Sequence, residues 1–139
     1  MFFLGFDPGR DKCGVAIMEC DRQIHFHQVF TSETVLAEIP KLCEQFPVEQ
    51  VVMGNQTTSK QWKEKLESIL STQITVAMVD ERNSSVEARD RYWHMYPPKG
   101  LTRLIPKSLR VPPRPVDDIV AILLIERYLK NGQWTMDNG

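Results

Sequence analysis

The sequence has no long apolar run, no paired cysteines and little net charge, and each absence narrows its class. No stretch approaches the roughly 18 consecutive apolar residues of a membrane span. The three cysteines are odd in number and none forms a C-x-x-C pair, which favours reduced thiols over disulfides or a zinc site. Because the N-terminus also lacks a secretory signal pattern, we expect a cytoplasmic protein. A net charge of -1 gives the chain no general basic signature for nucleic acid.

What is present is an ordinary globular composition. The 139 residues are 42% hydrophobic and 25% charged, which is enough for one domain with a sizeable core. We expect that domain over residues 1–130 and a polar C-terminal tail over residues 131–139.

The apolar periodicity predicts an α/β fold. Strands are predicted around residues 2–6, 14–18, 23–30, 48–53 and 74–79, and helices around residues 31–46, 58–70, 84–96 and 116–129. Pro40 is expected to kink or restart the first helix, and the spacing of Ser84 and Glu87 predicts a capping box at the third. Since helices connect the later strands, the β-β-β-α-β-α-β-α-α order implies a five-stranded mixed sheet with helices on both faces.

Acidic residues stand at the ends of three of these elements. Asp7 ends the first strand just before a Pro-Gly turn, Asp80 and Glu81 follow the fifth strand, and Asp117 and Asp118 open the last helix. Sites in such sheets form where the carboxyl ends of strands converge. Carboxylates brought together there would repel each other unless a cation joined them, and their hard oxygens suit Mg²⁺ or Mn²⁺. The pattern therefore favours metal-assisted phosphodiester chemistry.

Simpler interpretations exist for each of these residues. Asp7 could only open its turn, residues 80–82 could form a solvated loop, and Asp117 could only favour the start of a helix. His25 and His27 share one face of a strand, where polar residues of an edge strand facing water are favoured over a metal pair.

Four blocks of the sequence resemble the YqgF/RuvX family, and together they extend from Phe2 to about Leu129. The blocks are LGFDPGRDKCGVAI, VVMGNQTTS, VDERNSSVEAR and PVDDIVAILLIERYL. The family comprises Holliday-junction resolvases and pre-16S ribosomal RNA processing nucleases with a ribonuclease H-like fold. The resemblance implies a metal-dependent endonuclease with two Mg²⁺ or Mn²⁺ ions. Its acids correspond to Asp7, Glu81 and Asp117, which are therefore the expected catalytic and metal-binding residues.

The resemblance leaves several alternatives open. The family's G-L-P-x-x-x-D-G block appears here only as GNQTT, residues 54–58. The RuvC resolvases also begin with a D-P-G strand end, but they place their second acid after the fourth strand, where this chain has Gly54. The glycine pattern around Asp7 is also similar to the phosphate loop of actin-like kinases, which need two such domains. A non-catalytic RNA-binding or ribosome-assembly factor is the alternative function. The choice between RNA and DNA, a possible homodimer, and contributions from Asp80 or Asp118 stay open.

A basic segment precedes the last helix. Residues 91–115 contain six basic residues and no acid, which leaves 11 basic residues against 18 acidic ones in the rest of the chain. Six of the nine prolines lie in residues 97–115, so we expect a loop there. A solvated loop is the simpler interpretation, but an acidic body that binds a polyanion needs such cations. The residues expected to bind nucleic acid are Arg103, Lys107, Arg110 and Arg114.

Overall fold

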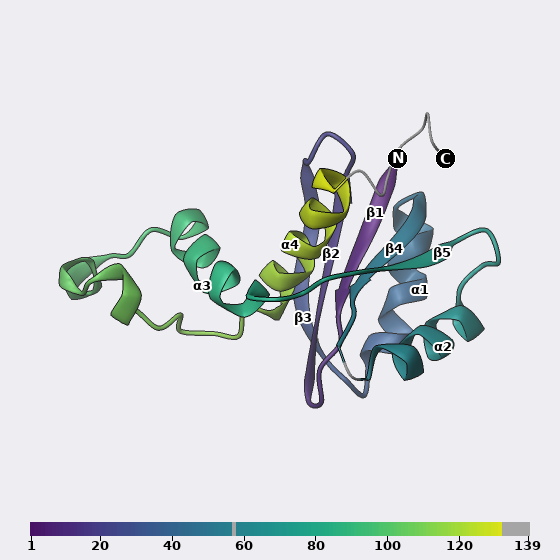
Figure 1. Cartoon of the computed structure of the whole chain (residues 1–139), viewed down its shortest axis with the longest axis horizontal. Coiled ribbons are helices and arrows are strands. Elements are labelled where there is room, and N and C mark those ends of the chain that lie inside the picture. Colours follow the sequence, from purple (N-terminus) through teal and green to yellow (C-terminus); the bar gives the residue numbers. More distant parts are fainter. Residues whose placement is uncertain (57, 132–139) are drawn as a thin grey trace.

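The structure is a computed structural model that describes residues 1–56 and 58–131, and it confirms the predicted order of elements (Figure 1). In chain order these are β1 (Phe2–Asp7), β2 (Lys12–Glu19), β3 (Ile24–Thr31), α1 (Val35–Gln45), β4 (Val48–Gly54), α2 (Ser59–Ile69), β5 (Thr75–Val79), α3 (Ser84–Met95), the short 3-10 helices η1 (Gly100–Leu104) and η2 (Lys107–Leu109), and α4 (Asp117–Lys130). The tail predicted for residues 131–139 lies, apart from Asn131, outside the described residues. No helix in the described ranges is long and apolar enough to cross a membrane.

The five strands form one mixed sheet in the order β3-β2-β1-β4-β5. Strands β1, β2 and β3 pair antiparallel, whereas β1, β4 and β5 pair parallel. The carboxyl ends of β1, β4 and β5 therefore meet at one edge of the sheet, together with the beginning of β2. This is the edge at which the predicted acids should gather.

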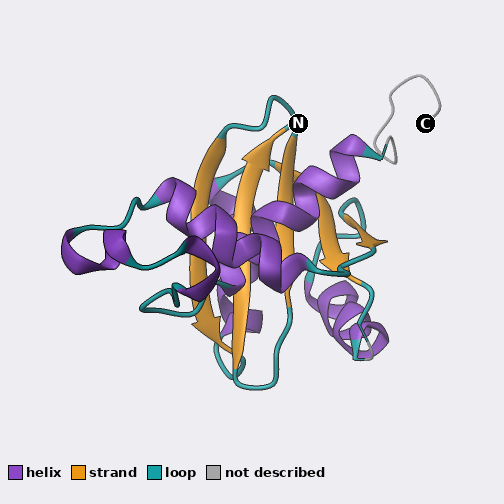
Figure 2. Ribbon diagram, turned by 60° about the vertical axis from the view of Figure 1, so that its left-hand side comes forward, coloured by secondary structure: helices purple, strands orange, loops and turns teal. Residues whose placement is uncertain are grey.

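Helices cover both faces of the sheet, as predicted (Figure 2). Side chains alternate along each strand, so Phe3 and Val52 pack against α3 and α4, while Leu4 and Met53 pack against α1 and α2. Helix α4 lies between the sheet and α3, and its residues 118–125 are all buried. A helix enclosed on two sides must be apolar around its circumference, which explains its sequence.

Two local predictions need comment. Helix α1 continues through Pro40 from Val35 to Gln45, so of the two outcomes expected there the restart does not occur. The second prediction is wrong. The predicted capping box does not form at α3, because Asn83, with a left-handed φ of 62°, is the N-cap and makes no side-chain capping bond. The tight turn out of β5 needs a positive φ at this position, which asparagine tolerates better than most residues. Ser84 consequently becomes the first helical residue and is buried.

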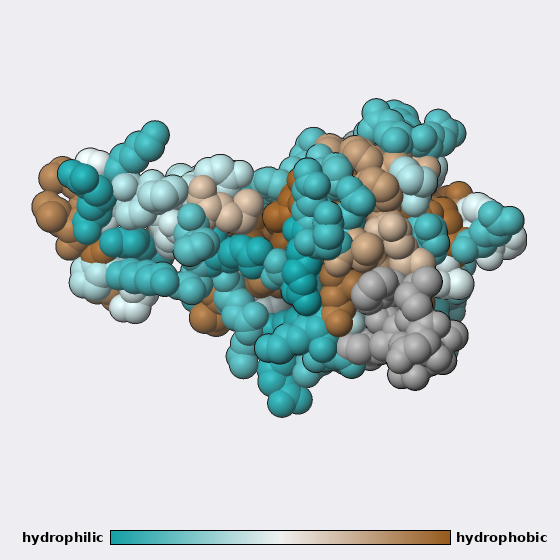
Figure 3. Space-filling model, turned by 90° about the horizontal axis from the view of Figure 1, so that it is seen from above, coloured by the Kyte–Doolittle hydropathy of each residue, from teal (hydrophilic) through white to brown (hydrophobic). Residues whose placement is uncertain are grey.

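The segment between α3 and α4, residues 96–116, extends away from the body and is called the arm below (Figure 1, green). It contains η1 and η2 rather than being a plain loop. Four of its apolar side chains are 69–82% exposed: Leu101, Leu104, Leu109 and Val111. They colour the end of the arm brown in the space-filling view (Figure 3). The arm therefore presents apolar as well as basic groups to the solvent.

Candidate functional site

The site is built on a row of three positions across the sheet: Gly54, Asp7 and Gly14. Asp7 is directly opposite Gly14 on β2, and Gly54 follows Met53, the partner of Phe6 on β4. Asp7 thus has a glycine on the strand at either side. Because glycine has no side chain, each of these positions leaves room on the α4 face of the sheet for a group from elsewhere in the chain.

Asp117 occupies the room above Gly14. A Cβ atom placed on Gly14 would lie 1.8 Å from the carbonyl oxygen of Asp117, so the start of α4 rests directly on β2. Gly5 admits α4 in the same way one turn further on, where a Cβ would lie 2.3 Å from the carbonyl oxygen of Ala121. This close approach brings the side chain of Asp117 into hydrogen-bonding contact with Asp7.

Glu81 occupies the room above Gly54. A Cβ atom on Gly54 would lie 2.7 Å from both Cδ and Oε2 of Glu81. The sharp turn that ends with Asn83 folds back here, and the N–H of Ser84 donates to the carbonyl of Glu81 at 3.0 Å. The other carboxylate oxygen, Oε1, is buried and has no hydrogen-bond partner in the described part of the chain.

The pKa values of all three carboxyls are raised, mainly by burial. Burial, followed by the charges of Asp117 and Glu81, raises the pKa of Asp7 from 3.8 to about 8. Burial also raises the pKa of Glu81, helped by Asp80 and opposed by Arg127. The pKa of Asp117 rises with burial too, although accepting a hydrogen bond from Asp7 opposes the rise. With a pKa of about 8, Asp7 keeps its proton at neutral pH and can donate a hydrogen bond to the carboxylate of Asp117.

The cluster has the chemistry of a cation site, although its three carboxyls do not all converge on a single point. In the residues the structure describes, no three His, Cys, Asp or Glu side chains are grouped closely enough to hold a metal ion. The proton on Asp7 reduces the negative charge that Asp7 and Asp117 would otherwise share. A bound cation would reduce that charge in the same way. The unpartnered Oε1 of Glu81 and the oxygen-only donor set fit Mg²⁺ or Mn²⁺.

The neighbouring acids Asp118 and Asp80 have other partners. Asp118 is only 2% exposed and turns away from Asp7. Its Oδ2 lies 2.6 Å from Nδ1 of His27, and its Oδ1 accepts a hydrogen bond from Arg114 at 3.0 Å. Despite burial, these two partners hold the pKa of Asp118 below its usual value. Asp80 is exposed and accepts a bond from the backbone of Arg82.

The arm carries less free positive charge than the sequence suggests. Of the six basic residues in residues 91–115, three form ion pairs with acids outside that range: Arg91, on α3, with Glu126, Lys107 with Asp90, and Arg114 with Asp118. Arg110 donates to the backbone carbonyls of the arm itself. Among the predicted binding residues, Arg103 and Arg110 form no ion pair with an acid in the described ranges. Their binding of nucleic acid stays a prediction.

Three features of the site were not found from the sequence. His27 was expected to face water but is bound to Asp118, and the signal for this was only that it lies on the same strand face as Val29. Lys12 stands close enough to Asp117 to lower its pKa. Gly54 keeps the first glycine of the family's G-L-P-x-x-x-D-G block, and its part in seating Glu81 becomes visible only when β4 and the turn after β5 are seen together.

Comparison with known proteins gives one family and one fold. The model of the RuvX family, described as Holliday junction resolvase, matches residues 1–131. The Holliday junction resolvase of fowlpox virus has a TM-score of 0.61 at 10% identity, with 94% of this chain and 99% of that one covered. Thermus thermophilus RuvC has a TM-score of 0.57 at 17% identity, with 95% and 97% covered. The same RuvC bound to a Holliday junction has a TM-score of 0.53 at 16% identity, with 95% and 96% covered. These likenesses show a ribonuclease H-like fold.

Two further comparisons do not help to assign a function. Chains described as sugar kinases are covered over only 38–40% of their length at TM-scores of 0.44–0.47. No curated protein shows a significant match to this sequence.

Proposed function

The chain belongs to the RuvX family of Holliday junction resolvases, and from this premise we propose that it is a divalent-metal-dependent endonuclease that cuts structured nucleic acid. The observation that carries the proposal is that Asp117 and Glu81, from two distant segments, lie close enough to Asp7 for their charges to raise its pKa. Burial and the two other acids disfavour the charge of Asp7, and no basic group is among the causes of its shift. A carboxyl whose pKa is raised this strongly by burial and neighbouring acids is typical of a functional site.

In this proposal Asp7, Glu81 and Asp117 hold two Mg²⁺ or Mn²⁺ ions. When bound, the ions supply charge neutralisation at the phosphate and water activated for attack. Asp7 stands between the other two acids, and it would have to release its proton before it could serve as a metal ligand. Gly14 and Gly54 keep the flanking carboxyls in place.

Branched DNA is the substrate with the most support. The family description names Holliday junctions, and one solved relative is RuvC bound to such a junction. Precursor 16S ribosomal RNA is the second candidate, and the resemblance of the four sequence blocks is its only support. Cutting a junction symmetrically would favour a two-fold homodimer with paired sites.

The test is a cleavage panel with matched variants. The substrates are single-stranded RNA, a precursor ribosomal RNA fragment, duplex DNA and a four-way DNA junction, each with Mg²⁺ or with EDTA. We expect metal-dependent cleavage of the junction, no cleavage by Asp7→Asn, and full cleavage by Asp11→Asn, which removes an exposed acid from the same turn. Equal activity of the wild type and Asp7→Asn would reject the proposal, as would binding without cleavage of any substrate, which would favour the non-catalytic RNA-binding alternative.

A further inference from the structure

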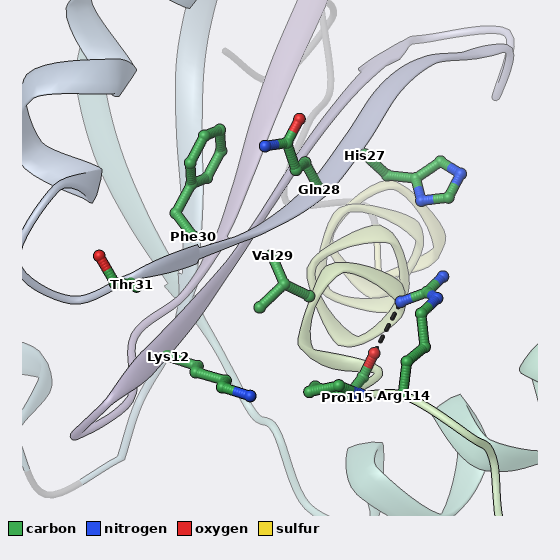
Figure 4. A pocket seen from close by; sticks show the side chains of 8 residues that line it. All are labelled: Lys12, His27, Gln28, Val29, Phe30, Thr31, Arg114 and Pro115. Carbon is green, nitrogen blue, oxygen red and sulfur yellow. Dashed lines mark hydrogen bonds between the residues drawn. The ribbon is translucent and has the colours of Figure 1, made fainter.

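A pocket of about 420 Å³ lies beside the acid cluster, between the free edge of β3 and the start of α4 (Figure 4). The proposed cleavage reaction makes no use of it. Lys12 and Arg114 stand on two sides of the pocket, and Val29 lies between them (Figure 4). Pro115 closes the side nearest the arm.

The strand register fixes how far this pocket is from Asp7. Asp7 is opposite Gly14, and Gly14 is opposite Val29, so the three positions form one row across β1, β2 and β3. Two strand spacings amount to roughly 10 Å. Residues in one cross-strand row point to the same face, so Val29 and Asp7 both face α4. A strand of nucleic acid has one phosphate about every 3.4 Å of helix axis, so the pocket is one to three nucleotides from a phosphate held at Asp7.

Arg114 is held rigidly at the rim of this pocket. Its guanidinium donates to Asp118 at 3.0 Å and to the carbonyl of Pro115 at 2.6 Å. It also lies over the rings of Tyr92 and Tyr96, with its Cζ atom 5.4 and 5.8 Å from their centroids. A planar cation fixed in this way is a surface on which a base can stack without losing side-chain entropy.

Lys12 provides the second recognition element. It is opposite Thr31 in the strand register, two rows from the pair of Gly14 and Val29 and on the same face of the sheet. Its flexible ammonium can meet a phosphate as a point charge. The volume is in the range of pockets that take small organic molecules and exceeds what a lone phosphate needs. An apolar floor with a stacking cation on one side and a free ammonium on the other suits a nucleotide.

We propose that this pocket binds one unpaired nucleotide of the substrate, one to three positions from the phosphate that is cut. The base packs on Val29, Pro115 and the face of Arg114, and Lys12 binds the adjoining phosphate. This inference rests on the proposed function, since it assumes that the scissile phosphate lies at Asp7. It gives the enzyme a preference for strands whose bases are already unstacked, as they are at a branch or in a loop, because an unstacked base costs less to place in a pocket.

The test measures binding in EDTA, so it does not depend on cleavage. The probes are a four-way DNA junction and a bulged RNA hairpin, each intact or with a single abasic site one, two or three nucleotides from the branch or bulge. Loss of a stacked base should weaken wild-type binding about tenfold at one of these positions. Val29→Trp, which fills the pocket, should bind the intact probe about tenfold more weakly and show no further loss at that position. Arg10→Ala removes an exposed cation from the same hairpin and should keep the wild-type abasic penalty.

Two results would overturn the inference: an abasic penalty that is equal in the wild type and Val29→Trp, or no penalty at any position on either probe. If Val29→Trp does not fold, Val29→Ala provides the test. Removing the apolar floor of the pocket should lower the abasic penalty from about tenfold to about threefold. The probe that shows the penalty identifies DNA or RNA as the source of the nucleotide. If the wild type shows the abasic penalty but cuts no substrate with Mg²⁺, the pocket proposal stands and the proposed nuclease function is rejected.

Discussion

Replacing Asp7 with asparagine should remove most of the pH dependence from the stability of the metal-free protein. Burial beside Asp117 and Glu81 raises the pKa of Asp7 from 3.8 to about 8. Between these two values the folded state keeps a proton that the unfolded chain has lost. The stability of the wild type therefore falls as the pH rises, by about 1.4 kcal/mol for each pH unit.

The expected magnitude follows from the width of that window. The interval from pH 5 to pH 7 lies well inside it, so the contribution of Asp7 to the free energy of unfolding should fall by about 3 kcal/mol over this range. Asparagine has nearly the same shape and stays neutral at every pH. The difference in stability between Asp7→Asn and the wild type should consequently shift in favour of the variant by about 3 kcal/mol between pH 5 and pH 7.

Urea denaturation in EDTA at pH 5, 6 and 7 measures this difference. Asp11→Asn removes an acid from an exposed position of the same turn and should follow the wild type at all three pH values. Adding Mg²⁺ at pH 8 should stabilise the wild type by mass action and leave Asp7→Asn unchanged. Parallel stability profiles for the wild type and Asp7→Asn would show that Asp7 does not share its proton with a buried partner, and the description of the site would be wrong.

Three further variants test other parts of the structure, and a triple variant tests the arm. Gly54→Ala should leave stability within about 1 kcal/mol but lower cleavage at least tenfold, because its Cβ displaces the movable carboxylate of Glu81. Gly14→Ala should instead cost about 3 kcal/mol or more in urea denaturation, since its Cβ meets the backbone of α4. Asp118→Asn should cost about 2–4 kcal/mol in the same assay by taking the carboxylate away from Arg114 and His27, while metal-dependent cleavage persists where the protein is folded. The alanine triple variant of the arm should weaken binding of all nucleic acids and lower the slope of log K against log[salt] by about 1 to 3. Its substitutions are Arg103→Ala, Lys107→Ala and Arg110→Ala.

The order of strands and helices could be predicted because local patterns determine it. Alternation along β1 and β2, and the apolar circumference of α4, are properties of short stretches of sequence. The position of Asp7 at a strand end could also be predicted, since a Pro-Gly turn follows it. Pairing by helical crossovers then placed the carboxyl ends of β1, β4 and β5 at one edge of the sheet.

Features that depend on contacts between distant segments could not be predicted. A glycine in a strand signals only a close approach, and the sequence does not say that Asp117 approaches Gly14 or that Glu81 approaches Gly54. The arm shows the same limit for charge. Its excess of basic residues is real, but Asp90 and Asp118 are supplied from elsewhere in the chain and pair with two of its five basic residues, Lys107 and Arg114.

The clearest instance is the pair Asp117 and Asp118, whose roles the sequence leaves open. Successive residues of an α-helix point about 100° apart, so adjacent acids at the start of α4 must face different neighbours. Helix α4 crosses the sheet over β2, with β1 on one side and β3 on the other (Figure 1). Asp117 consequently meets Asp7 on β1 and forms no ion pair in the described residues; burial raises its pKa, although Lys12 opposes the rise. Asp118 meets His27 on β3 and also Arg114, and its pKa falls. One acid is left needing a counter-ion and the other is already neutralised, so the rotation of a single helix assigns Asp117 to the proposed metal site and Asp118 to anchoring the arm.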